Sequence, residues 1–206
     1  MLETLLALIL ISAVLMIGVR RIKLLTQGFI VQSLSIALIC LYFSYKTGES
    51  NLLIIAILTI LAKVILIPYI INKSIKDLKL TREMDLIINS LWSYILCCVG
   101  IVFTYGLLAD MDNPFLKAGI VIMLVGAVLI IGRKKAITQM IGFLCMENGL
   151  VLFEISIVKM SLIMEAGIIL EVLILAVIMG IMIFNINRTF DTVNTDYLSN
   201  LNEREG

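Results

Sequence analysis

Long, continuous runs of apolar residues dominate the chain, and short polar or charged segments separate them. The runs do not alternate between polar and apolar positions as a half-buried strand would. Their lengths are close to the ~20 residues with which an α-helix crosses a bilayer, and a helix satisfies its own backbone polar groups in lipid. The pattern therefore predicts seven transmembrane helices, over about residues 2–19, 24–45, 52–71, 86–108, 114–132, 136–158 and 162–187.

The composition indicates that lipid is the solvent for most side chains. Of the 206 residues, 61% are hydrophobic, whereas soluble domains are about 45–50% apolar. Seven spans with short loops use almost the whole length, so no separate domain remains to hold a nucleotide, flavin or substrate. We expect an all-α, polytopic integral membrane protein of the inner (cytoplasmic) membrane. Because Glu3 stands where a signal peptide has basic residues, we expect the first run to be retained as a helix.

Basic residues are concentrated in alternate connections between the predicted spans. The segments after the first, third, fifth and seventh spans hold Arg20, Arg21, Lys23, Lys73, Lys76, Lys79, Arg82, Arg133, Lys134, Lys135 and Arg188. The other connections hold only Lys46, Lys117 and Lys159, with the acidic Asp110 and Asp112. Because basic connections stay on the cytoplasmic side, this pattern predicts an outside N-terminus and a cytoplasmic C-terminus.

The residue types argue against several kinds of cofactor site. The chain has no histidine, which removes histidine-ligated haem, histidine proton relays and most zinc sites. The cysteines lie in predicted spans without a CxxC pair, which argues against an iron–sulfur cluster or a disulfide framework; they are Cys40, Cys97, Cys98 and Cys145. We interpret them as packing residues, and we expect no cofactor or metal in this chain and no nucleic-acid partner.

Ionisable residues inside the apolar runs are the main candidates for chemistry. Lys63 lies in the middle of the third span. Glu147 lies about eleven residues into the sixth span, near the bilayer centre, and Glu154 follows on the same helix face about 10 Å away. Glu171 lies about nine residues into the seventh span, again near mid-depth, and Glu165 lies closer to the outer surface.

Charges at this depth need partners. Burying one of them at mid-membrane costs about 2.5–3.5 kcal/mol on insertion scales, so Lys63, Glu147 and Glu171 should face one another, a water-filled cavity or a neighbouring subunit. Groups of both signs that can change protonation suit proton transfer between helices, and we expect a proton path that Glu154 extends outward. The alternative is a static Lys–Glu salt bridge that fixes helix packing, and Glu165 is equally consistent with an interfacial acid without a role.

Two neighbouring residues are candidates for supporting roles. Asn148 could orient the Glu147 carboxylate by hydrogen bonding, or it could hold two helices together. Pro68 has no backbone N–H, so it leaves a carbonyl near Val64 without its helical donor. The resulting kink beside Lys63 could be a gating or hydration point, or it could be ordinary helix bending.

Four short segments follow one another along the predicted spans. They are Lys63-Val64 with Pro68, Met146-Glu147-Asn148-Gly149 after a basic loop, Glu165-Ala166-Gly167 before Glu171, and Asp191-Thr192-Val193-Asn194-Thr195-Asp196 near the end. Together they resemble component E of the formate-hydrogenlyase type (group 4) of membrane-bound nickel–iron hydrogenases, and the resemblance covers essentially the whole chain.

The last three predicted spans also resemble two smaller subunits, the K subunit of complex I and the C subunit of multisubunit cation/proton antiporters. Those subunits have three helices and two key membrane glutamates. Their pattern places the first glutamate where this chain has Leu144 and the second near Ala176. Glu147 and Glu171 therefore look like equivalents by location rather than by motif.

The resemblance implies a non-catalytic membrane subunit that conducts protons within a hydrogenase complex. The implied partners are antiporter-like and H-type membrane subunits and a cytoplasmic hydrogenase module, which would hold the nickel–iron and iron–sulfur centres. Two alternatives stay open. One is a subunit of a multisubunit cation/proton antiporter without a redox partner, and the other is a structural membrane spacer.

These expectations divide the chain into four regions. Residues 1–85 form three helices and a cytoplasmic linker, in which the polar segment 72–85 is expected to be a solvated connection or a short surface helix. Residues 86–113 form the fourth helix and an outer loop. Residues 114–188 form the K-subunit-like region of three helices, and residues 189–206 form a cytoplasmic tail.

Overall fold

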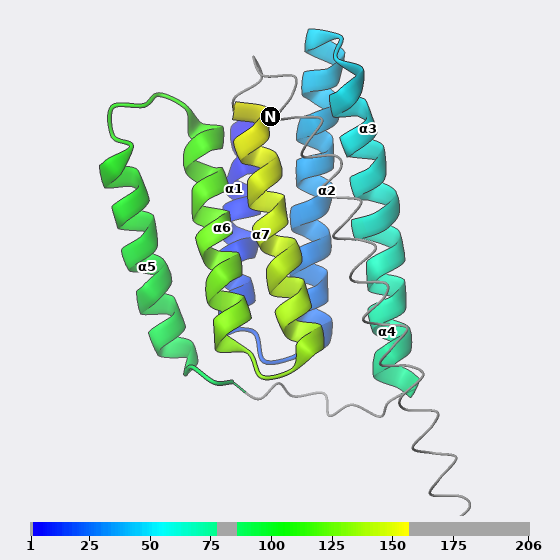
Figure 1. The fold of residues 1–206 in the computed structure, drawn as a ribbon, viewed down its shortest axis with the longest axis vertical. Helices are drawn as coiled ribbons and strands as arrows, with labels where there is room; N and C mark the ends of the chain where they lie inside the picture. Colours follow the sequence, from blue (N-terminus) through cyan, green and yellow to red (C-terminus); the bar gives the residue numbers. More distant parts are fainter. Residues whose placement is uncertain (1, 78–85, 157–206) are drawn as a thin grey trace, which may run out of the picture.

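The computed structural model describes residues 2–77 and 86–156, and in these two ranges it contains helices and their connections without a strand. The elements are α1 (Leu2–Gly18), α2 (Ile22–Thr47), α3 (Ser50–Leu58), the π-helix η1 (Thr59–Leu66), α4 (Ile67–Asp77), α5 (Ser90–Leu107), α6 (Pro114–Gly132) and α7 (Ala136–Ser156). Figure 1 shows them as a bundle of roughly parallel and antiparallel rods. The expectation of an all-α chain is confirmed for this part of the molecule.

Four of the described helices are long and apolar enough to cross a membrane, namely Ile22–Thr47, Ser50–Asn72, Ser90–Leu107 and Pro114–Gly132. A fifth, α1, is apolar but shorter. The third helix is continuous through α3, η1 and α4 to Asp77, so it reaches beyond the expected end at residue 71, and no Gly or Pro interrupts residues 72–77. The expected seventh span, the C-terminal tail and most of the 72–85 connection lie outside the described residues.

Two helix ends have clear local causes. Gly48 ends α2 with a φ of 73°, and its N–H donates to the carbonyl of Ser44 at 2.9 Å, a left-handed cap that glycine adopts at little cost. Asn113 begins α6: its side-chain oxygen accepts from the N–H groups of Phe115 and Leu116, both at 3.2 Å. Pro114 follows at the first helical position, where no N–H is needed.

α2 and α7 pack against each other and bring the polar residues of the bundle together. α2 packs against α1, α3, η1 and α7, while α7 packs most extensively against α6. α5 lies at one edge and contacts α6 and α1. Its outer face exposes Leu91, Trp92, Ile95, Leu96, Val99, Val102 and Phe103. Such a face suits hydrocarbon, because lipid imposes no cost on exposed apolar side chains.

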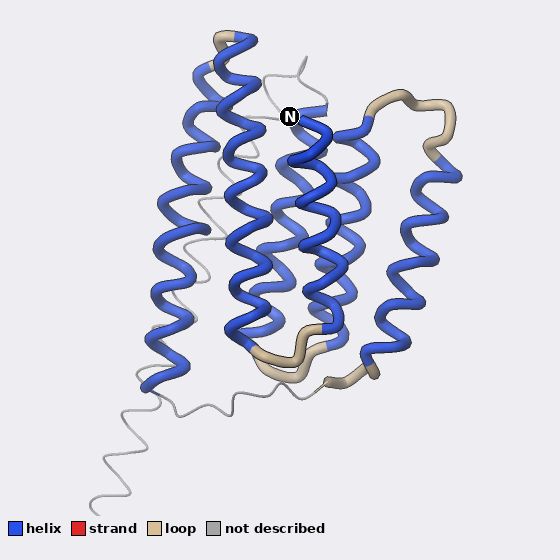
Figure 2. Tube along the Cα trace, turned by 180° about the vertical axis from the view of Figure 1, so that it is seen from behind, coloured by secondary structure: helices blue, strands red, loops and turns tan. Residues whose placement is uncertain are grey.

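The loops with basic residues gather at one end of the bundle. The connection between α1 and α2 and the connection between α6 and α7 lie side by side there, next to the start of α5 (Figure 2). Arg20, Arg21 and Lys134 are exposed at this end. The opposite end carries the α5–α6 loop, in which Asp110 and Asp112 are exposed. The alternation of charge along the sequence thus becomes a difference between the two ends of the fold.

One basic residue of these loops is not exposed. Arg133 belongs to a basic connection predicted from the sequence, but its side chain is buried and donates from Nη2 to the carbonyls of Met16 and Ile17 at 3.1 and 3.0 Å. These carbonyls belong to the last turn of α1, where no helical N–H is available and a cation is favoured. Burial lowers the pKa of Arg133, and the nearby Tyr94 offsets part of this shift. The guanidinium nevertheless stays charged at neutral pH. Arg133 therefore ties the end of α6 to the end of α1.

The α6–α7 contact is close because glycines face one another across it. A methyl group on Gly149 would lie 2.6 Å from the carbonyl oxygen of Gly119, and one on Gly126 would lie 2.5 Å from the backbone nitrogen of Met146. A methyl group on Gly142 would lie 2.9 Å from the Cβ of Leu129. Real Cβ atoms do not approach other heavy atoms this closely, so glycine at these positions permits the contact.

We expect Gly149→Ala to lower the free energy of unfolding by about 1–3 kcal/mol, because the added methyl group forces the two backbones apart. Gly106→Ala on α5 is the matched control: no atom lies within 4 Å of its added Cβ. That change should be neutral or stabilising by up to about 1 kcal/mol through helix propensity. Reversible unfolding in mixed micelles measures both, and equal effects would contradict the close-contact explanation.

Arg133→Met should lower the free energy of unfolding by about 1.5–3 kcal/mol, because it removes charge-assisted hydrogen bonds and leaves buried carbonyls unsatisfied. Lys134→Met is the control, since the Lys134 side chain is exposed and its loss should change stability by no more than about 0.5 kcal/mol. The same unfolding assay applies. An Arg133→Met protein as stable as the wild type would show that the α1 cap is dispensable.

Candidate functional site

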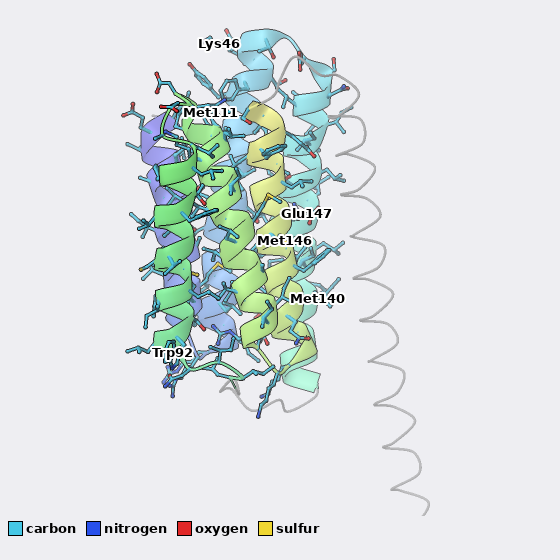
Figure 3. The ribbon with its side chains drawn as sticks, turned by 60° about the vertical axis from the view of Figure 1, so that its left-hand side comes forward. Lys46, Trp92, Met111, Met140, Met146 and Glu147 are labelled. Atoms are coloured by element: carbon cyan, nitrogen blue, oxygen red, sulfur yellow. The ribbon has the colours of Figure 1, made fainter. Side chains whose placement is uncertain are left out.

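Lys63 and Glu147 form an ion pair inside the bundle. The Nζ atom of Lys63 lies 3.4 Å from Oε2 of Glu147, and the two side chains are 0% and 3% exposed. Lys63 belongs to η1, which lies within the continuous helix Ser50–Asn72. Glu147 belongs to the middle of α7 (Figure 3). The structure therefore brings together two of the three mid-depth charges singled out from the sequence, across two different helices.

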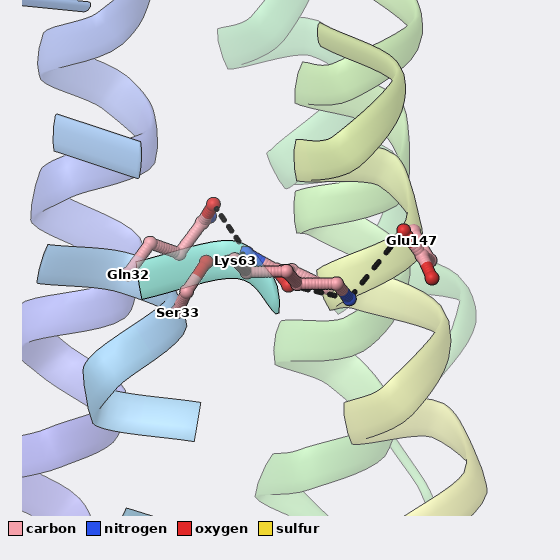
Figure 4. A network of polar contacts seen from close by, with 5 residues as sticks. Gln32, Ser33, Lys63 and Glu147 are labelled. Carbon is pink, nitrogen blue, oxygen red and sulfur yellow. Dashed lines mark hydrogen bonds and ion pairs between the residues drawn. The ribbon is translucent and has the colours of Figure 1, made fainter. Parts of the chain in front are cut away.

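Asn148 joins this ion pair to α2. Its Oδ1 atom accepts a hydrogen bond from Lys63 Nζ at 3.2 Å. Its Nδ2 atom donates to Oγ of Ser33 at 2.9 Å and to Oε1 of Gln32 at 3.2 Å. Side chains from α2, η1 and α7 thus meet in one polar network, which Figure 4 shows from close by. Because Lys63 can only donate, the amide oxygen of Asn148 must face it, and the two acceptors on α2 hold the amide in that orientation.

The supporting role expected for Asn148 therefore has a specific form. Its hydrogen bonds go to Lys63 and to α2, so it fixes the cation that faces Glu147. It also links α7 to α2, which was the second expectation for this residue. One amide supplies an acceptor to Lys63 and donors to α2, so these contacts support the interhelical role, while orientation of the Glu147 carboxylate by Asn148 stays a prediction.

Gln32 and Ser33 were not among the residues that the sequence singled out. Both are fully buried in α2. Both side chains are uncharged, and charge carries the large insertion cost in lipid. The available signal was weaker: an amide and a hydroxyl stand next to each other in an otherwise apolar run, Ile30-Val31-Gln32-Ser33-Leu34. An amide buried at that depth needs a hydrogen-bonding partner on another helix.

The helix around Lys63 is wider than an α-helix. Residues Thr59–Leu66 are π-helical, and the N–H of Ile67 donates to the carbonyl of Ala62, five residues earlier. Pro68 follows directly and has no backbone N–H to donate, so it cannot continue this hydrogen-bond register. The sequence predicts a kink at this place. The structure shows a π-helical segment, a feature often found at functional sites.

Glu154 extends the polar positions toward one end of the bundle. It is 6% exposed and lies seven residues after Glu147 on α7, near the end of the helix that faces the α5–α6 loop. Thr59, which is fully buried, precedes Lys63 by one turn in the same direction. Glu165 and Glu171 lie outside the described residues, so their expected places on a path stay predictions.

No family model, curated protein or solved structure matched the chain in the comparisons. The described residues also contain no group of three or more His, Cys, Asp or Glu side chains that could hold a metal ion. The geometry of the polar network is therefore the basis for a functional interpretation.

This network can hold a mobile proton without a large change in charge. The ion pair is neutral as a whole, and transfer of a proton from Lys63 to Glu147 gives two neutral groups. Removing only one partner is different, because an uncompensated charge in a buried site costs about 3–5 kcal/mol. The two residues are thus coupled: a change in the protonation of one changes the most favourable state of the other.

Proposed function

We propose that the chain is a membrane subunit of a complex I-like, membrane-bound hydrogenase, in which its buried Glu and Lys residues take part in proton translocation driven by redox chemistry in partner subunits. The observation that carries the proposal is the Lys63–Glu147 ion pair, held inside the bundle by Asn148. The order of the sequence segments around these residues supports the choice of complex.

A proton path explains why titratable groups occupy this depth. Two apolar side chains of similar volume would pack as well or better, because desolvation offsets much of the attraction in a buried ion pair. Groups that accept and release protons can pass a proton along a path, which apolar side chains cannot do. Glu171 and Glu165 would continue the path on the seventh span, and Glu154 would connect it to the outer side.

The proposal places the chain in the inner membrane with seven spans, an outside N-terminus and a cytoplasmic C-terminus. The gathering of exposed basic side chains at one end of the bundle supports this orientation. Antiporter-like and H-type membrane subunits would be the neighbours in the bilayer. A cytoplasmic module would hold the nickel–iron and iron–sulfur centres and would lie at the basic end.

We expect Glu147→Gln to reduce redox-driven proton translocation by the intact complex at least about tenfold, since the amide keeps the shape but loses the titratable proton. Glu3→Gln is the matched control, because Glu3 is exposed at the start of α1. Proton uptake into inverted vesicles measures the flux, and co-purification of the partner subunits measures assembly.

Normal pumping by an assembled Glu147→Gln complex would refute the proton path. Loss of assembly in that variant would instead favour the static salt bridge or the membrane spacer. An active complex that purifies without a nickel-containing subunit and exchanges cations for protons would identify the chain as an antiporter subunit.

The orientation has its own test. A single cysteine introduced as Lys134→Cys should react with a membrane-impermeant maleimide only in inverted vesicles, and Asp110→Cys should react only in right-side-out cells, because the two exposed residues lie at opposite ends of the bundle. A variant without the native cysteines is the background, since Cys98 is exposed. Labelling of Lys134→Cys from outside would reverse the proposed topology.

A further inference from the structure

The side chains around Lys63 present oxygen atoms of the kind that bind alkali cations. The carboxylate of Glu147 and the amide oxygen of Asn148 lie 3.4 and 3.2 Å from Lys63 Nζ. The oxygens of Gln32 and Ser33 lie one hydrogen bond further, at 3.2 and 2.9 Å from Asn148 Nδ2. All five side chains are buried. Sites that select alkali cations in membrane proteins are built from carbonyl and carboxylate oxygens that line a buried position.

The position that a Na⁺ ion would take beside Glu147 holds the ammonium group of Lys63. The lysine is part of the chain, so this cation cannot leave. A second cation would need to displace the ammonium or to share the carboxylate with it. Sharing would give the buried network a net charge of +1, which carries the cost of an uncompensated charge away from water. A proton that moves between Lys63 and Glu147 leaves the net charge unchanged.

We propose that Lys63 is a tethered cation that excludes Na⁺ and K⁺ from the oxygens around Glu147, and so restricts the ion handled at this site to the proton. The inference rests on the proposed function, because it assigns the ion that the proton path carries. It also identifies Lys63 as a specificity-determining residue, in addition to its place in the path. Removing its ammonium group should convert the same oxygens into a Na⁺ site.

The test uses the full chain, purified in detergent and reconstituted in nanodiscs, with Na⁺ alone as the probe. Saturable binding of radioactive Na⁺ is measured together with the melting temperature in NaCl and in choline chloride of equal ionic strength. We expect no saturable binding to the wild type and the same melting temperature in both salts. Lys63→Met should bind Na⁺, and its melting temperature should rise by about 4 °C in NaCl.

Two further variants identify the cause of the change. Lys63→Arg keeps a cation on the same helix, so it should not respond to Na⁺. Lys63→Met combined with Glu147→Gln lacks the carboxylate, so it should lose the response. The binding of Na⁺ to Lys63→Met should also increase with pH, because Na⁺ and a proton compete for the Glu147 carboxylate. Lys63→Gln is measured beside Lys63→Met, and we expect it to bind Na⁺ as well. If one of the two variants fails to fold, the other still tests the inference.

Saturable Na⁺ binding to the wild-type chain would overturn the inference, as would a folded Lys63→Met and a folded Lys63→Gln that both ignore Na⁺. These outcomes are separate from the test of the proton path. A wild-type chain that excludes Na⁺, in a complex that pumps normally without Glu147, would refute the proposed function alone. A chain that binds Na⁺, in a complex that needs Glu147 for pumping, would refute the exclusion alone.

Discussion

A buried cation must have an anion within reach, and in this bundle that requirement joins the third helix to α7. The ammonium of Lys63 lies 3.4 Å from the carboxylate of Glu147, so the two helix backbones can be separated by no more than their two side chains span. Asn148 adds α2 to the same arrangement through Gln32 and Ser33. Separating any of these helices would leave a charge or an amide without a partner in a medium that cannot supply one.

The rest of the fold holds α7 at the height that this pairing requires. Gly149 and Gly126 let its backbone contact that of α6. At one end, the side chain of Asn113 donates to the carbonyl of Ser156 at 3.3 Å. At the other, Gln139 donates to the carbonyl of Arg133 at 2.7 Å, while Arg133 itself binds the end of α1. These contacts fix the rotation and the depth of α7, and with them the position of Glu147.

The helices and the charged pair could be predicted from the sequence, because both rest on large free-energy terms. Continuous apolar runs leave few alternatives to helices in lipid, and the cost of a buried charge made Lys63 and Glu147 conspicuous. Gln32 and Ser33 carry smaller penalties and did not stand out. The burial of Arg133 could not be predicted, because Arg133 is followed by two more basic residues. Three consecutive basic residues predict a loop, and the sequence does not show which of them is buried. The π-helix is a local change of hydrogen-bond register, and the apolar pattern around Lys63 does not distinguish it from an α-helix.

The same ion pair that fixes the helices also limits how the site can function. In the proposed proton path, a proton shifts between Lys63 and Glu147, and that shift needs no entry of ions and no separation of helices. Movement of the whole ammonium would have to break the hydrogen bond to Asn148 as well, and that amide is held by two acceptors on α2. The network is therefore stiff toward displacement of its heavy atoms and open to displacement of a proton. This difference favours relay chemistry over transport of a larger cation through the centre of the bundle.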